Sequence, residues 1–214
     1  INKTGKEVVK PKYDCVWPFS EGLAIVGLDG KYGYINKTGK VVVKPKYEGA
    51  FYFSEGLAKV WLDGKCGFIN KTGKEVVKPK YDDAGDFSEG LARVELDGKW
   101  GFINKTGKVV VKPEYEDVRS FTEGLAGVDL DGKWGVINKT GKEVVKPKYD
   151  DVYNFSEGLA VVKLDYKYGV INKTGKEVVK PKYDLVYEFS EGLARVELDG
   201  KYGYINKTGK EVVK

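Results

Sequence analysis

The feature that most constrains this sequence is an internal repeat of constant length. The tripeptide Thr-Gly-Lys recurs with its threonine at positions 4, 38, 72, 106, 140, 174 and 208, so every interval is 34 residues. A fixed period of roughly 20 to 50 residues is typical of solenoids, propellers and other arrays whose units pack on their neighbours. The 214 residues are therefore expected to form a single repeat domain, 1–214. Chain length alone is not a guide to the number of domains in such an array.

The period also fixes the expected boundaries of the units. Residues 1–12 form a partial N-terminal repeat, and the six repeats that follow are 13–46, 47–80, 81–114, 115–148, 149–182 and 183–214. Residues 1–10 have the same sequence as residues 205–214, which is expected of a segment from a longer array or of a designed chain.

Glycine-containing turns divide each repeat into short strands. In the repeat 47–80, Asp-Gly at 63–64 is typical of a two-residue β-hairpin, and Lys-Thr-Gly at 71–73 predicts a slightly longer one. Ser-Glu-Gly at 54–56 predicts a further reversal, which adds a fourth short strand. Lys-Pro at 78–79 is expected to end the last strand, because proline has no amide hydrogen to donate. We therefore predict an all-β fold of six tandem antiparallel β-meanders.

No segment has the apolar spacing of an amphipathic helix over three turns, which excludes helix as a main element. The strand expected at 57–62 alternates apolar residues with more polar ones, so one face is expected to be buried and one wet. In other repeats this second face carries Arg93 and Glu95, or Arg195 and Glu197. Since propeller blades are covered on both faces, the pattern favours an open β-solenoid or superhelix, with a six-bladed β-propeller ring as the alternative.

Composition argues against most enzyme classes. The chain has no histidine, and Cys15 and Cys66 lie at different phases of the repeat, which disfavours a disulfide between them. We expect no catalytic residues, no metal site and no cofactor. The 37 basic and 32 acidic residues are interleaved, which disfavours nucleic-acid binding. No apolar stretch approaches the roughly 20 residues of a membrane helix, and nothing in the sequence indicates a compartment.

Several motifs together resemble a known repeat. Lys-Trp-Gly at 99–101 and 133–135 is followed by Ile-Asn-Lys-Thr-Gly-Lys and then Val-Val-Lys-Pro, with Phe-Ser-Glu-Gly-Leu-Ala in most units. The pattern resembles the WG repeat, also called the KWG repeat, of bacterial proteins. The tryptophan is replaced in the other four copies by Tyr32, Cys66, Tyr168 and Tyr202. The resemblance implies a β-rich interaction module without established catalytic activity, and it supplies no catalytic residue.

Two residue series are constant throughout the repeats. The phenylalanines are expected to form an aromatic ladder in the core and the glutamates to support turns; they are Phe19, Phe53, Phe87, Phe121, Phe155 and Phe189, and Glu21, Glu55, Glu89, Glu123, Glu157 and Glu191. A series of single carboxylates, each a repeat apart, does not predict a cation site, because each lacks a second ligand.

The positions that differ between repeats indicate where function lies. Varied positions on a constant framework can form a contact surface, and large aromatic residues are typical anchors of such surfaces. The candidate binding surface comprises Trp17, Phe51, Tyr52, Trp61, Arg119, Tyr153 and Tyr187. We predict a non-enzymatic scaffold that binds a macromolecule, in the first place a protein. The alternatives are a multivalent module for carbohydrate or another small ligand, and a purely structural spacer or filament.

Overall fold

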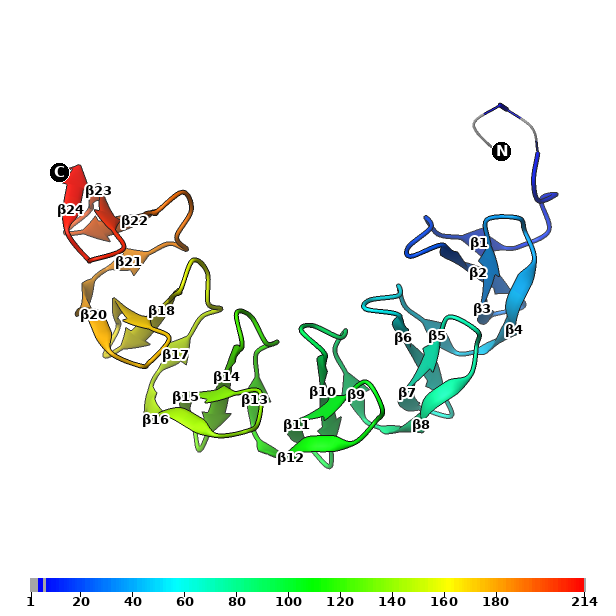
Figure 1. Ribbon diagram of the computed structural model, residues 1–214, viewed down its shortest axis with the longest axis horizontal. Helices are drawn as coiled ribbons and strands as arrows, with labels where there is room; N and C mark the ends of the chain where they lie inside the picture. The colour runs from blue at the N-terminus through cyan, green and yellow to red at the C-terminus, as the bar shows by residue number, and fades with distance from the viewer. Residues whose placement is uncertain (1–3, 6, 214) are drawn as a thin grey trace. The chain divides into compact units, whose positions relative to one another are not determined.

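The computed structural model describes residues 4, 5 and 7–213, and within them every regular element is a β-strand (Figure 1). The strands form six antiparallel sheets of four strands each, which confirms the predicted all-β class. The preference for an open array over a ring stays a prediction. By its internal contacts the chain divides into two compact units, residues 1–97 with 103–108 and residues 98–102 with 109–214.

Each sheet takes its four strands consecutively from the chain. The first three sheets are β1 (Cys15–Val16), β2 (Leu23–Leu28), β3 (Lys31–Asn36) and β4 (Val41–Tyr47); β5 (Gly49–Ala50), β6 (Leu57–Leu62), β7 (Lys65–Asn70) and β8 (Glu75–Tyr81); and β9 (Asp83–Ala84), β10 (Leu91–Leu96), β11 (Lys99–Asn104) and β12 (Val109–Tyr115). The last three are β13 (Asp117–Val118), β14 (Leu125–Leu130), β15 (Lys133–Asn138) and β16 (Glu143–Tyr149); β17 (Asp151–Val152), β18 (Leu159–Leu164), β19 (Lys167–Asn172) and β20 (Glu177–Tyr183); and β21 (Leu185–Val186), β22 (Leu193–Leu198), β23 (Lys201–Asn206) and β24 (Glu211–Val213).

The Asp-Gly turn between the second and third strands has the predicted two-residue form. Leu62 pairs with Lys65, which leaves Asp63 and Gly64 as the loop. Their φ angles are 52° and 70°, both positive, as a type I′ turn requires. This turn has the right-handed twist of its flanking strands, so it fixes their register.

The Asn-Lys-Thr-Gly turn is stabilised by the side chain of its asparagine. Asn70 Oδ1 accepts hydrogen bonds from the Thr72 amide at 3.0 Å, the Thr72 hydroxyl at 2.7 Å and the Lys74 amide at 3.0 Å. Equivalent bonds form at Asn36, Asn104, Asn138, Asn172 and Asn206. The local sequence therefore satisfies the backbone of its own turn.

The prediction that Lys-Pro ends the last strand is wrong. Strand β8 continues through Pro79 to Tyr81, and the other complete sheets behave alike. The register between β7 and β8 shifts in this region, as it does at a β-bulge. Proline is tolerated in β8 because this strand is the outermost of its sheet. An outermost strand pairs on one side only, so one of its residues can lack an amide hydrogen without loss of a pairing hydrogen bond.

This bulge explains the constant glycine that follows the tryptophan position. A Cβ atom added at Gly135 would lie 2.6 Å from the Val145 carbonyl oxygen and 2.9 Å from the Pro147 nitrogen. Equivalent approaches to backbone occur at Gly33, Gly67, Gly101 and Gly169. Since real Cβ atoms do not approach backbone so closely, only glycine fits opposite the bulge.

The cores lie between adjacent sheets rather than within one sheet. In the first unit, Tyr34 and Val43 of the first sheet pack with Phe53 and Val60 of the second. In the second unit, a comparable cluster joins the fifth and sixth sheets, in which Val161 is 4% exposed. Val161 has the same phase as Arg93, on the face of the second strand that was expected to contact water. That face is therefore partly covered by the neighbouring sheet.

Candidate interaction surface

One variable position of the repeat lies just after the short first strand, where the backbone makes the same hydrogen bond in each copy. The Phe51 amide donates a hydrogen bond to the Lys59 carbonyl oxygen at 3.1 Å, and the Tyr187 amide donates to that of Arg195 at 2.9 Å. The same bond forms at Trp17, Gly85, Arg119 and Tyr153. Because this bond uses no side-chain atom, the position accepts very different residues without loss of the sheet.

The side chains at this position lie beside the residue that replaces or supplies the signature tryptophan. The ring of Trp17 meets that of Tyr32 edge to face, with centroids 5.6 Å apart. The guanidinium of Arg119 lies 4.8 Å from the centroid of Trp134. In these two copies, the side chain at the variable position thus packs against an aromatic residue of the third strand.

Cations of the second strand cover one ring face at two of these positions. Lys59 Nζ lies 4.2 Å from the centroid of the Phe51 ring, and the Arg195 guanidinium lies 3.8 Å from that of Tyr187. Arg195 also lies 5.5 Å from the centroid of Tyr202. These cation–π contacts orient the rings and place positive charge beside them.

Four of the seven candidate residues are exposed. Their exposed fractions lie between 37% and 43%, and they are Trp17, Phe51, Tyr52 and Tyr187. The first three belong to the first unit and Tyr187 to the second. These are the candidate residues that a partner could contact directly, and we refer to them as the exposed aromatic set.

The other three candidates are half-buried and engaged within the protein. Arg119 forms an ion pair with Asp151 at 2.9 Å and donates to the Val152 carbonyl oxygen at 3.2 Å, which ties the fourth sheet to the fifth. Burial, with a hydrogen bond to Tyr168, raises the pKa of Tyr153 to about 12. Trp61 packs against the core between the second and third sheets of the first unit. These residues stabilise the framework and support the surface from within.

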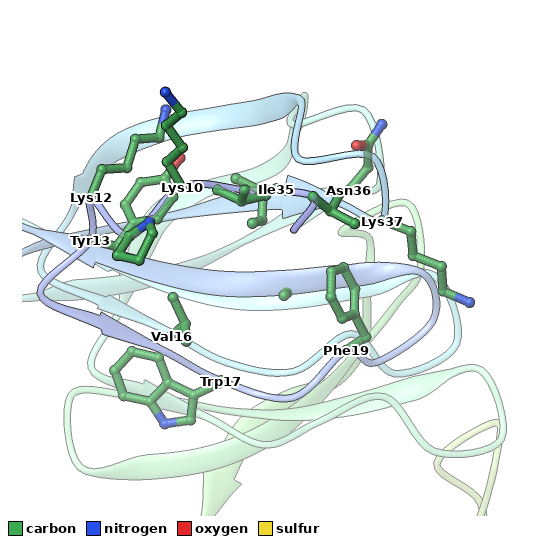
Figure 2. A pocket seen from close by; sticks show the side chains of 13 residues that line it. Lys10, Lys12, Tyr13, Val16, Trp17, Phe19, Ile35, Asn36 and Lys37 are labelled. Carbon is green, nitrogen blue, oxygen red and sulfur yellow. The ribbon is translucent and has the colours of Figure 1, made fainter. Parts of the chain in front are cut away.

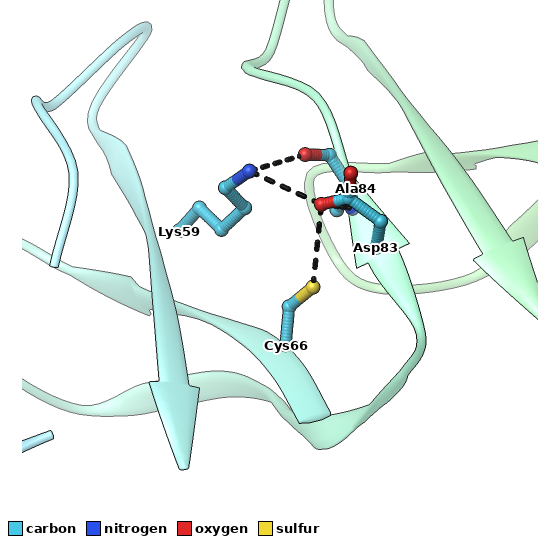
Figure 3. A network of polar contacts seen from close by, with 4 residues as sticks. All are labelled: Lys59, Cys66, Asp83 and Ala84. Atoms are coloured by element: carbon cyan, nitrogen blue, oxygen red, sulfur yellow. Dashed lines mark hydrogen bonds and ion pairs between the residues drawn. The ribbon is translucent and has the colours of Figure 1, made fainter. Parts of the chain in front are cut away.

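A polar network occupies the equivalent place where cysteine replaces the tryptophan (Figure 3). Lys59 Nζ donates to Asp83 Oδ1 at 3.3 Å and to the Ala84 carbonyl oxygen at 2.7 Å, and Cys66 Sγ lies 3.9 Å from the same carboxylate. Burial and the neighbouring Asp83 charge raise the pKa of the Cys66 thiol to about 12. The thiol is therefore protonated at neutral pH and is not an activated nucleophile.

The sequence did not reveal that the constant glutamates join neighbouring repeats. Glu21 Oε2 accepts a hydrogen bond from the Gly56 amide at 3.0 Å and pairs with Lys71 at 2.9 Å. The hydrogen bond from Lys71 is the main reason why the pKa of Glu21 is lowered. Equivalent ion pairs in the chain are Glu55–Lys105, Glu123–Lys173 and Glu157–Lys207. In the sequence, only the constant spacing between these glutamates and lysines could have indicated the ion pairs.

The described residues also set limits on other kinds of site. No cluster of three or more histidine, cysteine, aspartate or glutamate side chains is arranged to hold a metal ion in this part of the chain. Helices that could span a bilayer are likewise absent from the residues that the structure describes.

Solved structures with a similar fold are β-propeller-like proteins. A eukaryotic initiation factor aligns with a TM-score of 0.59 and 13% identity over 90% of this chain, which spans 62% of that protein. Hsv2 from Kluyveromyces marxianus aligns with a TM-score of 0.50 and 13% identity over 91% of this chain and 79% of that one. BamB from Moraxella catarrhalis aligns with a TM-score of 0.49 and 14% identity over 89% and 69% of the two chains. At these identities the likeness concerns the fold alone.

No curated protein matches the sequence. The model of the WG containing repeat matches in tandem along the whole chain, over residues 1–32, 32–66, 67–100, 100–134, 134–168, 168–202 and 202–214. The match includes the copies in which tyrosine or cysteine takes the place of the tryptophan. The glycine opposite the bulge is present in all of them, as the geometry of the outer strand requires. The chain belongs to the WG repeat family.

Proposed function

We propose that the chain is a non-enzymatic scaffold that binds another protein through the exposed aromatic set. One observation carries the proposal: a position that varies between repeats makes the same backbone hydrogen bond in every copy, and at Trp17, Phe51 and Tyr187 it presents an exposed aromatic ring on a constant framework. A surface of this kind can change its specificity without changing its fold.

The chemistry of the surface favours a protein partner. Tyrosine, tryptophan and arginine are enriched among the residues that dominate protein–protein binding energy. Tyr187 and Arg195 supply two of these types in direct contact. One face of the Tyr187 and Phe51 rings is already covered by a cation, and 38% and 39% of these residues, respectively, remain exposed to a partner. Mixed apolar and cationic contacts of this type suit an acidic peptide that contains apolar side chains.

Selection of a peptide display library against the immobilised full chain tests the proposal, since the enriched peptides reveal which side chains the surface prefers. We expect these peptides to bind the wild type and to lose about tenfold or more in affinity to Tyr52→Ser or Tyr187→Ser, which remove anchor rings. Tyr166→Ser is the matched control, because Tyr166 is 87% exposed but lies in a hairpin turn outside the variable position.

The outcomes separate the proposal from its alternatives. Peptides whose binding is indifferent to both anchor substitutions would contradict it. A simple saccharide that quenches tryptophan fluorescence in a stoichiometric manner would favour a carbohydrate-binding module instead. If no peptide or saccharide binds through these residues, the surface serves only as a structural spacer.

A further inference from the structure

An aspartate and the carbonyl group of the residue after it bind a cation at the joint between the second and third repeats. Lys59 Nζ donates to Asp83 Oδ1 at 3.3 Å and to the Ala84 carbonyl oxygen at 2.7 Å (Figure 3). The Lys59 side chain is only 13% exposed, so these two oxygens replace much of the water that a lysine normally binds. We call this carboxylate and carbonyl the acceptor pair.

The joint between the fourth and fifth repeats has an equivalent acceptor pair but takes its cation from elsewhere. Arg119 donates to Asp151 Oδ1 at 2.9 Å and to the Val152 carbonyl oxygen at 3.2 Å. Asp151 lies two periods after the aspartate of the first acceptor pair. Lys59 belongs to the second strand of its repeat, whereas Arg119 occupies the variable position after the short first strand. Two different positions of the repeat therefore deliver a cation to one place.

Glycine occupies the other of these two positions wherever arginine occupies one of them in the third and fourth repeats. A Cβ atom added at Gly127, on the second strand of the fourth repeat, would lie 3.2 Å from Cγ of Arg119. The third repeat has the reverse arrangement, because a Cβ atom added at Gly85, at the variable position, would lie 2.8 Å from Cγ of Arg93. In both repeats the arginine thus lies across the other position.

Joints without the aspartate have apolar residues at this place instead. Gly49 of the second repeat and Leu185 of the sixth stand where the acceptor pair has its aspartate. The repeats before them carry Ile25 and Val161 on the second strand, and each of these residues is 4% exposed. The variable position of the first repeat is Trp17, which Figure 2 shows at a cavity of about 710 Å³. These joints thus need no cation.

The sequence couples the two kinds of residue across every boundary. At each of the five boundaries between the six repeats, the later repeat has an aspartate at this phase only where the earlier one has lysine or arginine at one of the two positions. Arg93 and Asp117 complete this series in the sequence. An unpaired charge in a partly buried joint is unfavourable, which explains the coupling. By contrast, the constant pairs such as Glu21–Lys71, which we call the ionic clamps, do not follow this variation.

The source of the cation determines what remains at the variable position. Where Lys59 supplies it, Phe51 stays 39% exposed, and Nζ lies 4.2 Å from the centroid of its ring. Where Arg119 supplies it, the variable position is itself tied to the next repeat, and its guanidinium packs on Trp134. The second repeat therefore presents a ring at this position, while the fourth uses the same position for its joint.

We propose that, at joints with an acceptor pair, the second-strand residue decides whether a repeat offers its variable position to a partner protein. Lys59 satisfies the acceptor pair and releases Phe51 for recognition, whereas Gly127 commits Arg119 to the joint. Lys59 and Gly127 therefore determine specificity although neither is an exposed anchor. This inference rests on the proposed function, because it concerns the same surface, and it adds a rule for which repeats take part.

A double-mutant cycle tests the acceptor pair in the full chain without any partner. Asp83→Ala should raise the equilibrium constant for unfolding about tenfold or more, because it leaves the largely buried ammonium of Lys59 without its carboxylate. The same change in a Lys59→Met background should have an effect of about threefold or less. Lys31 and Glu48, whose ion pair is nearly half exposed, give the control cycle, with a coupling of about fivefold at most. Urea denaturation measures both cycles, and a coupling no larger than that of the control overturns the proposal.

Moving the cation tests the choice between the two positions. Lys59→Gly should destabilise the chain, whereas F51R/K59G, which copies Arg119 and Gly127 of the fourth repeat, should lower the unfolding constant again about tenfold. Asp83→Ala in the same chain should cancel this recovery, because the arginine then lacks its carboxylate. Circular dichroism establishes that the variants keep the β-sheet fold. Absence of a recovery, or a recovery that survives Asp83→Ala, overturns the proposal.

The peptides selected against the full chain test the release of Phe51. Among them we expect a group that loses about tenfold in affinity to Phe51→Ser. The same peptides should lose about threefold or more to Lys59→Met, which keeps the ring but removes the cation that orients it. Lys31→Met, which removes an equal charge outside this surface, should leave their affinity unchanged.

The outcomes distinguish this inference from the proposed function. Peptides that depend on Phe51 but not on Lys59 overturn the inference, and so does a selection without any peptide that depends on Phe51. Either result is compatible with peptides anchored by Tyr52 or Tyr187, which the proposed function requires. Loss of those anchored peptides would instead contradict the proposed function, while the denaturation cycles measure the joint by itself.

Discussion

Phe53 and Phe19 stand in the same local sequence, Phe-Ser-Glu-Gly-Leu-Ala, yet only Phe53 is buried. Phe53 packs on Tyr34 of the preceding sheet, whereas no sheet precedes that of Phe19 among the residues that the structure describes. The local fold around both residues is the same, with an isolated bridge from the following serine to leucine. The difference teaches that a repeat determines its own turns and strands, while its burial is decided by the repeat beside it.

The largest expected effect on this comparison comes from shortening the two phenylalanines. Phe53→Ala should lower the free energy of unfolding by about 3–5 kcal/mol, because it leaves a cavity between two sheets. Phe19→Ala should lower it by less than about 1 kcal/mol, because half of the ring is already in water. Urea denaturation followed by tryptophan fluorescence measures both values. Equal losses would show that the two positions are not different environments.

A smaller effect is expected from removing single hydroxyl groups. Tyr34→Phe deletes the donor to the Phe51 carbonyl oxygen, which should cost about 1 kcal/mol of stability. Tyr204→Phe removes a hydroxyl from the last sheet, where Tyr204 is 42% exposed, and should change stability by less than about 0.5 kcal/mol. The same denaturation assay compares the two variants. A marked loss in Tyr204→Phe would mean that its hydroxyl is bonded within the monomer.

The smallest effect, and one that depends on pH, is expected at the ionic clamps. The pKa of Glu21 is lowered in the folded protein, mainly by the hydrogen bond from Lys71. Its carboxylate therefore contributes stability above the unfolded-state pKa of about 4.3, and this contribution is lost as the pH falls through the folded-state pKa. Glu21→Gln should thus be less stable than the wild type at neutral pH and converge with it in acid.

Glu191→Gln is the control for that titration. Glu191 has the same phase but forms no ion pair among the described residues, so its replacement should lower the stability at neutral pH less than Glu21→Gln does. Thermal unfolding between about pH 3 and pH 7 compares the two variants with the wild type. If both variants behave alike, the clamp to Lys71 does not form in solution.

The elements that sequence predicted correctly depend on neighbours in the chain. Asp63 and Gly64 form their turn because both adopt positive φ angles, and Asn70 binds the backbone of its own turn. The passage of β8 through Pro79 could not be predicted in this way, because it depends on the bulge and on the position of the strand at the edge of the sheet. The partners of Glu21, the Gly56 amide and Lys71, were also missed, since both lie in the next repeat.

The candidate surface shows the same division. The variation between repeats predicted exposed aromatic residues, and Trp17, Phe51, Tyr52 and Tyr187 are exposed. It did not distinguish them from Arg119, whose guanidinium is held between two sheets by Asp151 and the Val152 carbonyl. A residue can therefore vary between repeats because its contacts inside the array vary, and only the structure separates this cause from recognition of a partner.

The proline in the outermost strand has a consequence for how the array avoids misfolding. Many nearly identical strands in one chain could pair in wrong combinations or add to strands of other molecules, as happens in amyloid. Pro45, Pro79, Pro113, Pro147 and Pro181 each remove one backbone donor from the outermost strand of a sheet, beside exposed lysines. In five of the six sheets, this proline in the outermost strand is therefore expected to disfavour pairing with a fifth strand and so to oppose aggregation of a highly repetitive chain.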